Sequence, residues 1–366
     1  MSFESGSVSF RMLYVPRDLP ADAVARFAKH AAPPIETLGD GVIQGWVTGR
    51  HLLDRNITEA TALHGGYLRL TLMQAERKIP EALLRAECRM EELAHMQAQG
   101  LERISQSARR DIRESISKRL LPTMPPTLKG IGLLYDPRSR LIYTSALSDT
   151  QLDAFQIGLS LALGFGGVPV LPETATLQRK KTSIKDWPPC SFSPDVADED
   201  VTSDPGLDFL TWLWFAAETR GGMFKLDKVG DWGAMIEGPL TFVREGAGAH
   251  EMVVRRGEPM VSAEAKAALL AGKKLRRAKL TLARGDLSFT CTFDAPSFVV
   301  RGLKVPDGEK LDAISKFQER MTFVDLFKEA LLCLFDRFVD ERLDGKKWKA
   351  TREEIHTWVK DRKTRG

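Results

Sequence analysis

The residues best placed to do chemistry are the basic ones between Arg255 and Arg284. This stretch holds nine lysines and arginines against two glutamates, although the whole chain has a formal net charge of only +4. Positive charge concentrated on a weakly charged protein is typical of a polyanion site, and nucleic acid is the commonest large polyanion. A solvated surface with scattered lysines has the same composition, so the positions of the charges must decide between the two. The candidate contacts in this stretch are Arg255, Arg256, Lys273, Lys274, Arg276, Arg277 and Lys279.

Alternation of apolar and polar residues predicts where some of these charges point. Leu275–Ala283 and Leu287–Phe293 both alternate and flank the turn Arg284–Asp286, which predicts a β-hairpin. Successive side chains of a strand point to opposite faces. One face of the hairpin should therefore be apolar, and the other should carry Arg277 and Lys279 together with several threonines. A positive, hydroxyl-bearing face suits phosphate contacts that do not read the bases.

A second basic group lies in residues 81–122, where amphipathic helices are predicted on either side of Gly100. The second of these helices has Ile112, Ile116 and Leu120 as its apolar stripe. Such a helix can lie on the protein and turn its cations toward a phosphate backbone, or it can be an ordinary surface helix. Its remaining sides carry the candidate contacts Arg109, Arg110, Arg113, Lys118 and Arg119.

No arrangement of residues predicts an active site. The sequence has no phosphate-binding loop, no G-x-S-x-G and no H-E-x-x-H motif. Glu76–Lys78 and Pro306–Lys310 hold the residue types of a metal-dependent nuclease, but neither has an obvious partner acid. Glu91 and His95 could supply half a metal site, and nothing supplies the other half. We therefore expect no enzyme activity, no catalytic residue, no metal and no cofactor.

The composition is that of a globular protein with two or three subdomains. Hydrophobic residues make up 43% and charged residues 28% of the chain, which is ordinary for such proteins. No apolar stretch is long enough to cross a bilayer, and residues 1–9 lack the features of a secretion signal. The four cysteines form no C-x-x-C pair, so we expect free thiols and a cytoplasmic protein.

The predicted elements make an α+β protein with mixed antiparallel sheets and long helices. Leu207–Glu218 suits a buried helix, Phe323–Arg342 a long helix capped by Thr322, and Thr351 the cap of a final helix. The chain then divides into an N-terminal α+β region (1–172, including the basic helical segment 81–122), a proline-rich charged loop or linker (173–206), a C-terminal α+β region with the basic hairpin (207–305), and a helical region with a basic tail (306–366).

Short motifs spread along the chain follow the order of one known family. They are GWV at Gly45–Val47, K-I-P at Lys78–Pro80, L-L-P at Leu120–Pro122, G-x-x-P-V with a further proline at Gly166–Pro172, L-T-x-x-W at Leu210–Trp214, M-F-K-L at Met223–Leu226, A-G-K at Ala271–Lys273 with L-x-L at Leu280–Leu282, and D-A-x-x-x-F at Asp312–Phe317. Each is weak alone. Together, from about Ser9 to Arg342, they resemble the bacterial recombination-associated RdgC family.

The resemblance implies a nucleoid-associated DNA-binding protein without enzyme activity. Members of that family form a ring-shaped homodimer of elongated protomers, with a basic central hole that can encircle duplex DNA. They bind with little sequence preference and restrain RecA-promoted strand exchange. The implied partners are therefore double-stranded DNA and a second copy of the chain, with RecA as a functional antagonist and no membrane.

The resemblance also carries site residues onto this chain. Arg255, Arg256 and the basic residues of the helix that ends at Leu120–Pro122 would lie near the hole. Thr123–Pro126 stands where family members can carry an aromatic residue near the gate of the ring. Two other functions stay open: a single-stranded nucleic-acid binder, which needs exposed aromatics among the basic residues, and a metal-dependent DNA-processing enzyme.

Overall fold

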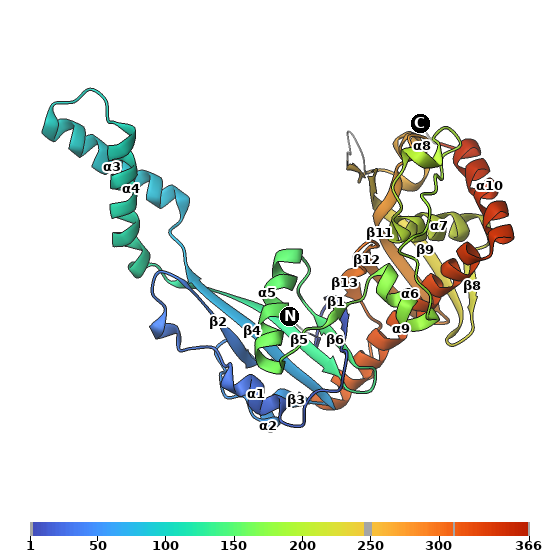
Figure 1. The fold of residues 1–366 in the computed structure, drawn as a ribbon, viewed down its shortest axis with the longest axis horizontal. Coiled ribbons are helices and arrows are strands. Elements are labelled where there is room, and N and C mark those ends of the chain that lie inside the picture. Colours follow the sequence, from blue (N-terminus) through green and yellow to red (C-terminus); the bar gives the residue numbers. More distant parts are fainter. Residues whose placement is uncertain (1–2, 245–250, 310–311, 365–366) are drawn as a thin grey trace.

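The computed structural model describes residues 3–244, 251–309 and 312–364, which form an elongated crescent (Figure 1). An N-terminal sheet occupies the middle of the crescent, a two-helix arm forms one end, and a C-terminal unit of sheet and helices forms the other. This arrangement confirms the predicted α+β class and the elongated protomer. No helix within the described ranges has the length and apolar character needed to cross a membrane.

The described strands join into one antiparallel sheet instead of separate sheets. The first strand is the link, because its two edges pair with different units: Phe10 lies opposite Val300, and Met12 lies opposite Tyr143. The main path of the sheet runs β10-β9-β11-β12-β13-β1-β6-β5-β4-β2. The strands are β1 Val8–Tyr14, β2 Val42–Thr48, β3 Leu63–His64, β4 Tyr67–Arg77, β5 Pro126–Asp136, β6 Leu141–Thr144, β7 Val168–Pro169, β8 Met223–Leu226, β9 Gly230–Val243, β10 Met252–Val254, β11 Lys274–Arg284, β12 Leu287–Asp294 and β13 Val299–Lys304.

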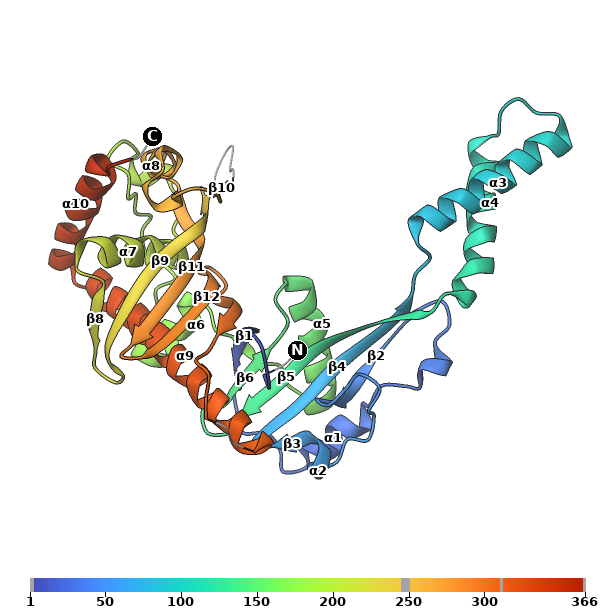
Figure 2. The same ribbon diagram turned by 180° about the vertical axis from the view of Figure 1, so that it is seen from behind.

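Helices cover one face of each half of this sheet. The C-terminal half is covered by α7 and α9, and its other face turns toward the opening of the crescent (Figure 2). The helices are α1 Ala23–Lys29, α2 Glu59–Ala62, α3 Glu81–Gln99, α4 Gln106–Leu120, α5 Asp149–Leu163, α6 Pro172–Lys180, α7 Pro205–Thr219, α8 Ala263–Leu270, α9 Ala313–Leu343 and α10 Gly345–Asp361.

The helix α7 is the centre of the C-terminal core, as the apolar run Leu207–Glu218 predicts. The Asp204 carboxylate caps it by accepting hydrogen bonds from the backbone N–H groups of Gly206 and Leu207, at 2.9 and 3.0 Å. Glycine is required at position 206, because a Cβ there would lie 2.6 Å from the Ala295 carbonyl oxygen. The aromatic side chains of this helix are completely buried: Phe209, Trp212 and Trp214.

The long helix α9 begins at Ala313, well before the predicted start at Phe323. The Asp312 carboxylate caps it by accepting hydrogen bonds from the backbone of Ile314 and Ser315, at 3.0 and 3.2 Å. The predicted cap, Thr322, lies inside the helix, where its hydroxyl donates to the Gln318 carbonyl at 3.0 Å. The prediction is wrong because a threonine can bond back to the preceding turn instead of ending a helix.

The final helix also begins earlier than predicted. Asp344 caps α10 by accepting a hydrogen bond from the Lys347 backbone N–H at 3.1 Å. Thr351, the predicted cap, is buried in the helix interior, and its hydroxyl donates to Glu341 of α9. Since its hydroxyl serves a contact between helices, Thr351 marks no helix start.

Residues 173–206 are not a free linker. The segment opens with α6, whose Arg179 pairs with Asp336 at 2.7 Å and whose Lys180 pairs with Asp340 at 2.6 Å, both on α9. Further along, Phe192 is buried in the C-terminal core. The prediction of a loop is therefore wrong over α6, because acids on a distant helix neutralise the basic residues that suggested a solvated segment.

The N-terminal sheet is fixed to α9 by a buried polar contact. The Tyr143 hydroxyl donates to the Asp325 carboxylate at 2.5 Å, and the buried Lys328 ammonium donates to the same carboxylate at 3.1 Å. Burial and the Asp325 charge raise the pKa of Tyr143, so its hydroxyl stays a donor. This contact therefore joins the N-terminal sheet to the long helix of the C-terminal unit.

Candidate nucleic-acid interface

The predicted basic hairpin is confirmed as β11 and β12, and its polar face lies on the inner side of the crescent (Figure 2). Ala278, Leu280 and Leu282 point into the core and are completely buried. The opposite face forms rows across neighbouring strands. One row runs Glu237–Lys279–Thr292–Arg301, and the next runs Met235–Thr281–Thr290–Lys304.

Acidic partners neutralise part of the charge on this face. Arg277 makes two hydrogen bonds to the Asp294 carboxylate, at 2.6 and 3.0 Å, and Lys279 pairs with Glu237 at 2.8 Å. A bulge at Arg276 brings a second guanidinium to 3.7 Å from the same Asp294 carboxylate. Glu237 lies on a strand far from the basic stretch in sequence, so sequence reasoning missed it.

The face nevertheless keeps an excess of positive charge. Its guanidinium and ammonium groups on Arg276, Arg277, Lys279 and Arg301 outnumber its two carboxylates. Burial lowers the pKa of Arg301, and the neighbouring charges of Arg277 and Arg11 act in the same direction, while Asp294 opposes them. Hydroxyl groups lie between the cations, and those of Thr281 and Thr290 are 3.1 Å apart.

Lys274 does not belong to this surface. Its side chain is buried, with the residue only 3% exposed, and its ammonium group pairs with the equally buried Asp208 of α7. The prediction that Lys274 contacts a polyanion is wrong, because α7 places a carboxylate in the core that needs a buried counter-charge. The preceding Lys273 is half-buried in the turn that leads into β11.

Arg255 and Arg256 lie in a bend after β10 and are exposed. No side-chain hydrogen bond or ion pair of either residue occurs with another part of the described chain. Arg255 borders a hollow of about 400 Å³ with Glu237 and the turn Pro259–Val261. These two arginines are therefore cations of the C-terminal unit that a phosphate can reach without displacing a carboxylate.

The arm confirms the two predicted helices. α3 ends at Gly100, which adopts φ 63°, and α4 begins at the capping residue Ser105, whose hydroxyl oxygen accepts a hydrogen bond from the Ala108 backbone at 3.2 Å. The two helices hold together through a small apolar contact of Leu84, Cys88 and Ile116, with Ile79, Ile112 and Leu120 at its edge.

The basic residues of α4 are exposed, but most have acidic neighbours. Arg113 and Arg119 pair with Glu81 and Glu87 of α3, at 3.3 and 2.8 Å. Residues 81–120 hold eight lysines and arginines against seven acids, so the arm is nearly neutral. Two further pairs are Lys118 with Glu114 at 2.8 Å and Arg109 with Glu92 at 3.9 Å. Arg110 alone among the five candidates of α4 has no such partner in the described residues.

An apolar stripe runs along the side of α3 that faces away from this contact. Leu83, Met90 and Leu93 are 37, 64 and 47% exposed, and their spacing puts them on one side of the helix. The neighbouring Leu84 is buried, whereas these three side chains lie in solvent. This stripe was not identified from the sequence, because adjacent apolar residues of a helix, such as Leu83 and Leu84, can lie on its outward and its buried side.

The sequence model of one protein family, described as "RdgC: Putative exonuclease, RdgC", matches residues 20–188. Over these residues the chain is a member of the RdgC family. The resemblance predicted from the motifs is thereby confirmed for residues 20–188. The match includes strands β2 to β7, the arm and α6, but it begins after β1 and ends before the basic hairpin. No curated protein sequence matches this RdgC member.

The acids suggested as half-sites of a nuclease are separated in this RdgC member. Glu76 accepts hydrogen bonds from Lys78 and Lys129 at 2.9 and 2.8 Å, and these bonds hold its pKa below the usual range. Across the residues that the structure describes, no three His, Cys, Asp or Glu side chains are grouped so that they could hold a metal ion. Of the other suggested group, Lys310 lies outside the described residues.

The segment after α4 shows the RdgC member's departure from the family pattern. Leu121–Thr123 forms a short 3-10 turn in which the Thr123 hydroxyl donates to the Leu120 carbonyl at 2.7 Å. Met124 follows, half-buried, and its carbonyl accepts a hydrogen bond from Arg77.

The four cysteines are free and buried, as predicted.

Proposed function

We propose that this RdgC member is a non-enzymatic protein that binds double-stranded DNA without sequence preference, encircles it as a homodimer and restrains RecA-dependent recombination in the bacterial nucleoid. The observation that carries this proposal is the uncovered sheet face on the inner side of the crescent, with its excess of cations and its threonine hydroxyls. Such a surface suits the phosphate backbone, which has the same charge in every sequence.

The ion pairs on this surface do not prevent DNA binding. Exposed pairs are worth about 0–1 kcal/mol each, so a phosphate can replace the carboxylate partner at small cost. Lys279 and Arg276 are free to exchange in this way, whereas Arg277 stays tied to the buried Asp294 carboxylate. Arg255 and Arg256 have no acidic partner in the described part of the chain that a phosphate would have to replace. Binding then releases counterions from the DNA and weakens as salt rises.

A second copy of the chain would close the crescent. The apolar stripe of Leu83, Met90 and Leu93 on α3 is the surface that we assign to this contact, because its spacing suits helix-to-helix packing and the arm projects beyond the body of the protein (Figure 1). A two-fold contact places the same stripe of both copies face to face. The two inner faces would then surround one duplex.

Single-stranded nucleic acid is the weaker alternative. A single-strand binder stacks bases on exposed aromatic side chains among its cations. The tryptophans of the C-terminal sheet and α7, Trp212, Trp214 and Trp232, are completely buried instead. Restraint of RecA follows most simply from occupation of the duplex that strand exchange must use, without contact to RecA itself.

Binding to duplexes of several sequences across a salt series tests the proposal. We expect equal affinities for all sequences and a linear fall of the logarithm of affinity with the logarithm of salt concentration. The same mixtures with Mg²⁺ or Mn²⁺ should leave plasmid DNA intact. Strong preference for one sequence or for single strands, or metal-dependent loss of plasmid, would contradict the proposal.

A further inference from the structure

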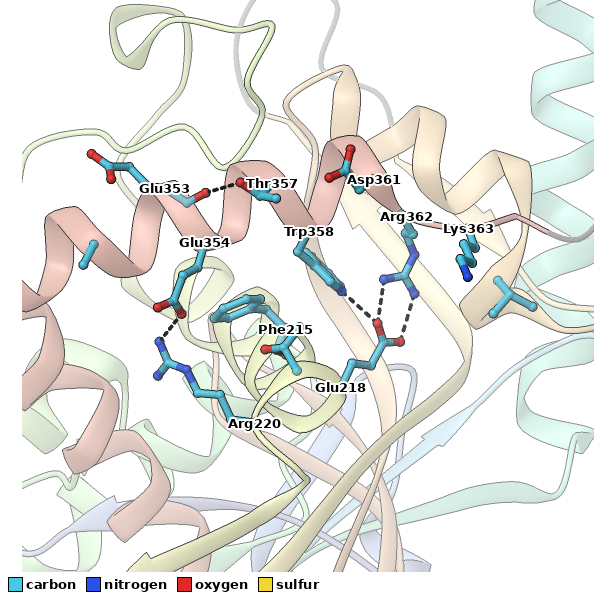
Figure 3. A pocket seen from close by; sticks show the side chains of 13 residues that line it. Phe215, Glu218, Arg220, Glu353, Glu354, Thr357, Trp358, Asp361, Arg362 and Lys363 are labelled. Carbon is cyan, nitrogen blue, oxygen red and sulfur yellow. Dashed lines mark hydrogen bonds and ion pairs between the residues drawn. The ribbon is translucent and has the colours of Figure 1, made fainter.

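A groove of about 1080 Å³ lies on the helical side of the C-terminal unit, away from the inner sheet face (Figure 3). The end of α7 and one side of α10 form its walls, and Val261 closes it. Its apolar floor is formed by the half-buried side chains of Trp358 and Val261, while Phe215 lies beneath, 1% exposed and covered by the Arg220 guanidinium 5.1 Å from its ring centre. A concave, largely apolar site with a few polar groups is the usual form of a small-molecule site.

The two guanidinium groups in the groove are already neutralised. Arg362 makes hydrogen bonds of 2.7 and 2.9 Å to the Glu218 carboxylate, and its guanidinium also lies 4.7 Å from the centre of the Trp358 ring. Arg220 donates to Glu341 at 2.9 Å and to Glu354 at 3.0 Å. Neither arginine is therefore available to an anionic ligand.

One end of the groove has an excess of negative charge. Around the single guanidinium of Arg220 lie the carboxylates of Glu341 and Glu354, and Glu353 stands at the rim of the same end. Glu353 makes no side-chain hydrogen bond or ion pair with another described residue. The last carbonyl groups of α7, which ends at Thr219, add partial negative charge there. The other end is close to neutral, since the exposed Lys363 offsets Asp361.

We infer that this groove binds a free aliphatic amine of the polyamine class. Its ammonium group would lie among Glu353, Glu354 and the end of α7, and its hydrocarbon chain would lie against Trp358 and Val261. The charge excess selects a cation, and the apolar floor selects a ligand with methylene groups over a bare metal ion. The site does not rest on DNA binding, because it lies on the opposite side of the C-terminal unit from the inner face.

Calorimetric titration of the DNA-free full-length protein with 1,5-diaminopentane tests this inference, with 1,5-pentanediol as the uncharged ligand of the same chain. We expect one site for the diamine and no binding of the diol. The double variant Glu353→Gln/Glu354→Gln should weaken the diamine by about tenfold, which is about 1.4 kcal/mol. Arg220 keeps its bonds to Glu341 and Thr351 in that variant, so the fold is retained.

Two further variants keep the test specific. Asp195→Asn/Glu199→Gln removes the same charge from exposed acids outside the groove and should leave the affinity unchanged. Ala350→Phe fills the groove without changing its charge and should abolish binding. Equal losses in both double variants, equal binding of the diol, or binding of a lysine-rich peptide but not of the diamine would overturn the inference.

Discussion

The inner sheet face and the arm both present basic residues, but they hold them in different ways. On the sheet, Arg277 is fixed to Asp294, a carboxylate whose side chain is only 4% exposed, on strands packed against a large core. On the arm, both members of a pair such as Lys118 with Glu114 are exposed, and the apolar contact between the two helices has only three buried residues. A count of lysines and arginines therefore says little, because the position of the acids decides which charges a phosphate can reach.

The largest expected effect concerns Lys274, a predicted surface contact that the structure places in the core beside Asp208. Lys274→Met leaves the Asp208 carboxylate buried without a partner, so the free energy of unfolding should fall by about 3–5 kcal/mol. Chemical denaturation measures this change. The double variant Lys274→Met/Asp208→Leu should recover most of the loss. A variant of normal stability with weakened DNA binding would instead return Lys274 to the interface.

The apolar stripe of α3 is the surface that we propose for the contact between two copies, because the nearly neutral charge of the arm suggests little contribution to DNA binding. We expect the unaltered protein to be a dimer and Met90→Glu/Leu93→Glu to be a monomer, since burying two carboxylates in an apolar contact is costly. Size-exclusion chromatography with light scattering measures the mass. Ser115→Glu, which adds the same charge to an exposed position of α4, should leave the dimer intact. A dimer in all three proteins would place the contact elsewhere.

Charge removal on the sheet face should weaken binding to every duplex alike. Arg276→Gln/Lys279→Gln keeps the Arg277–Asp294 pair and should lower affinity by about tenfold, while the slope of log affinity against log salt becomes shallower by about two. Fluorescence anisotropy over a salt series measures both quantities. An unchanged slope would mean that these cations do not meet phosphates.

The arm should contribute less to affinity than the sheet. Arg110→Gln removes its one candidate cation without an acidic partner in the described structure, so we expect about a twofold to threefold loss and a slope change of about one. Lys118→Gln, which removes a cation already paired with Glu114, is the matched control and should change less. If Arg110→Gln lowers the affinity for DNA more than Arg276→Gln/Lys279→Gln does, the arm contributes more than the sheet face and this prediction is wrong.

Local patterns predicted the elements of the fold better than their ends. The alternation of residues 275–293 and the apolar run at 207–218 correspond to β11, β12 and α7, because each pattern is set by the residues' own periodicity. The predicted starts of α9 and α10 were wrong, because several residues near each start can serve as caps. The structure uses Asp312 and Asp344, a choice that depends on how the helices pack.

The candidate site was predictable in position but not in charge. The sequence placed Arg277 and Lys279 on one polar face, and the structure does the same. It could not show Glu237 opposite Lys279 or Asp208 beneath Lys274, because both acids come from elements distant in sequence. Pairings between strands and helices far apart in the chain are fixed by tertiary packing, which no local pattern encodes.

Retention on closed DNA tests the central claim most directly. The protein is loaded at low salt onto a relaxed circular duplex and onto the same DNA made linear, and the fraction still bound is measured after a high-salt challenge. Encirclement predicts that the circle retains protein while the linear form loses it from its ends. Equal release from both forms would show that the basic surfaces hold DNA from one side, and the closed ring would then be wrong.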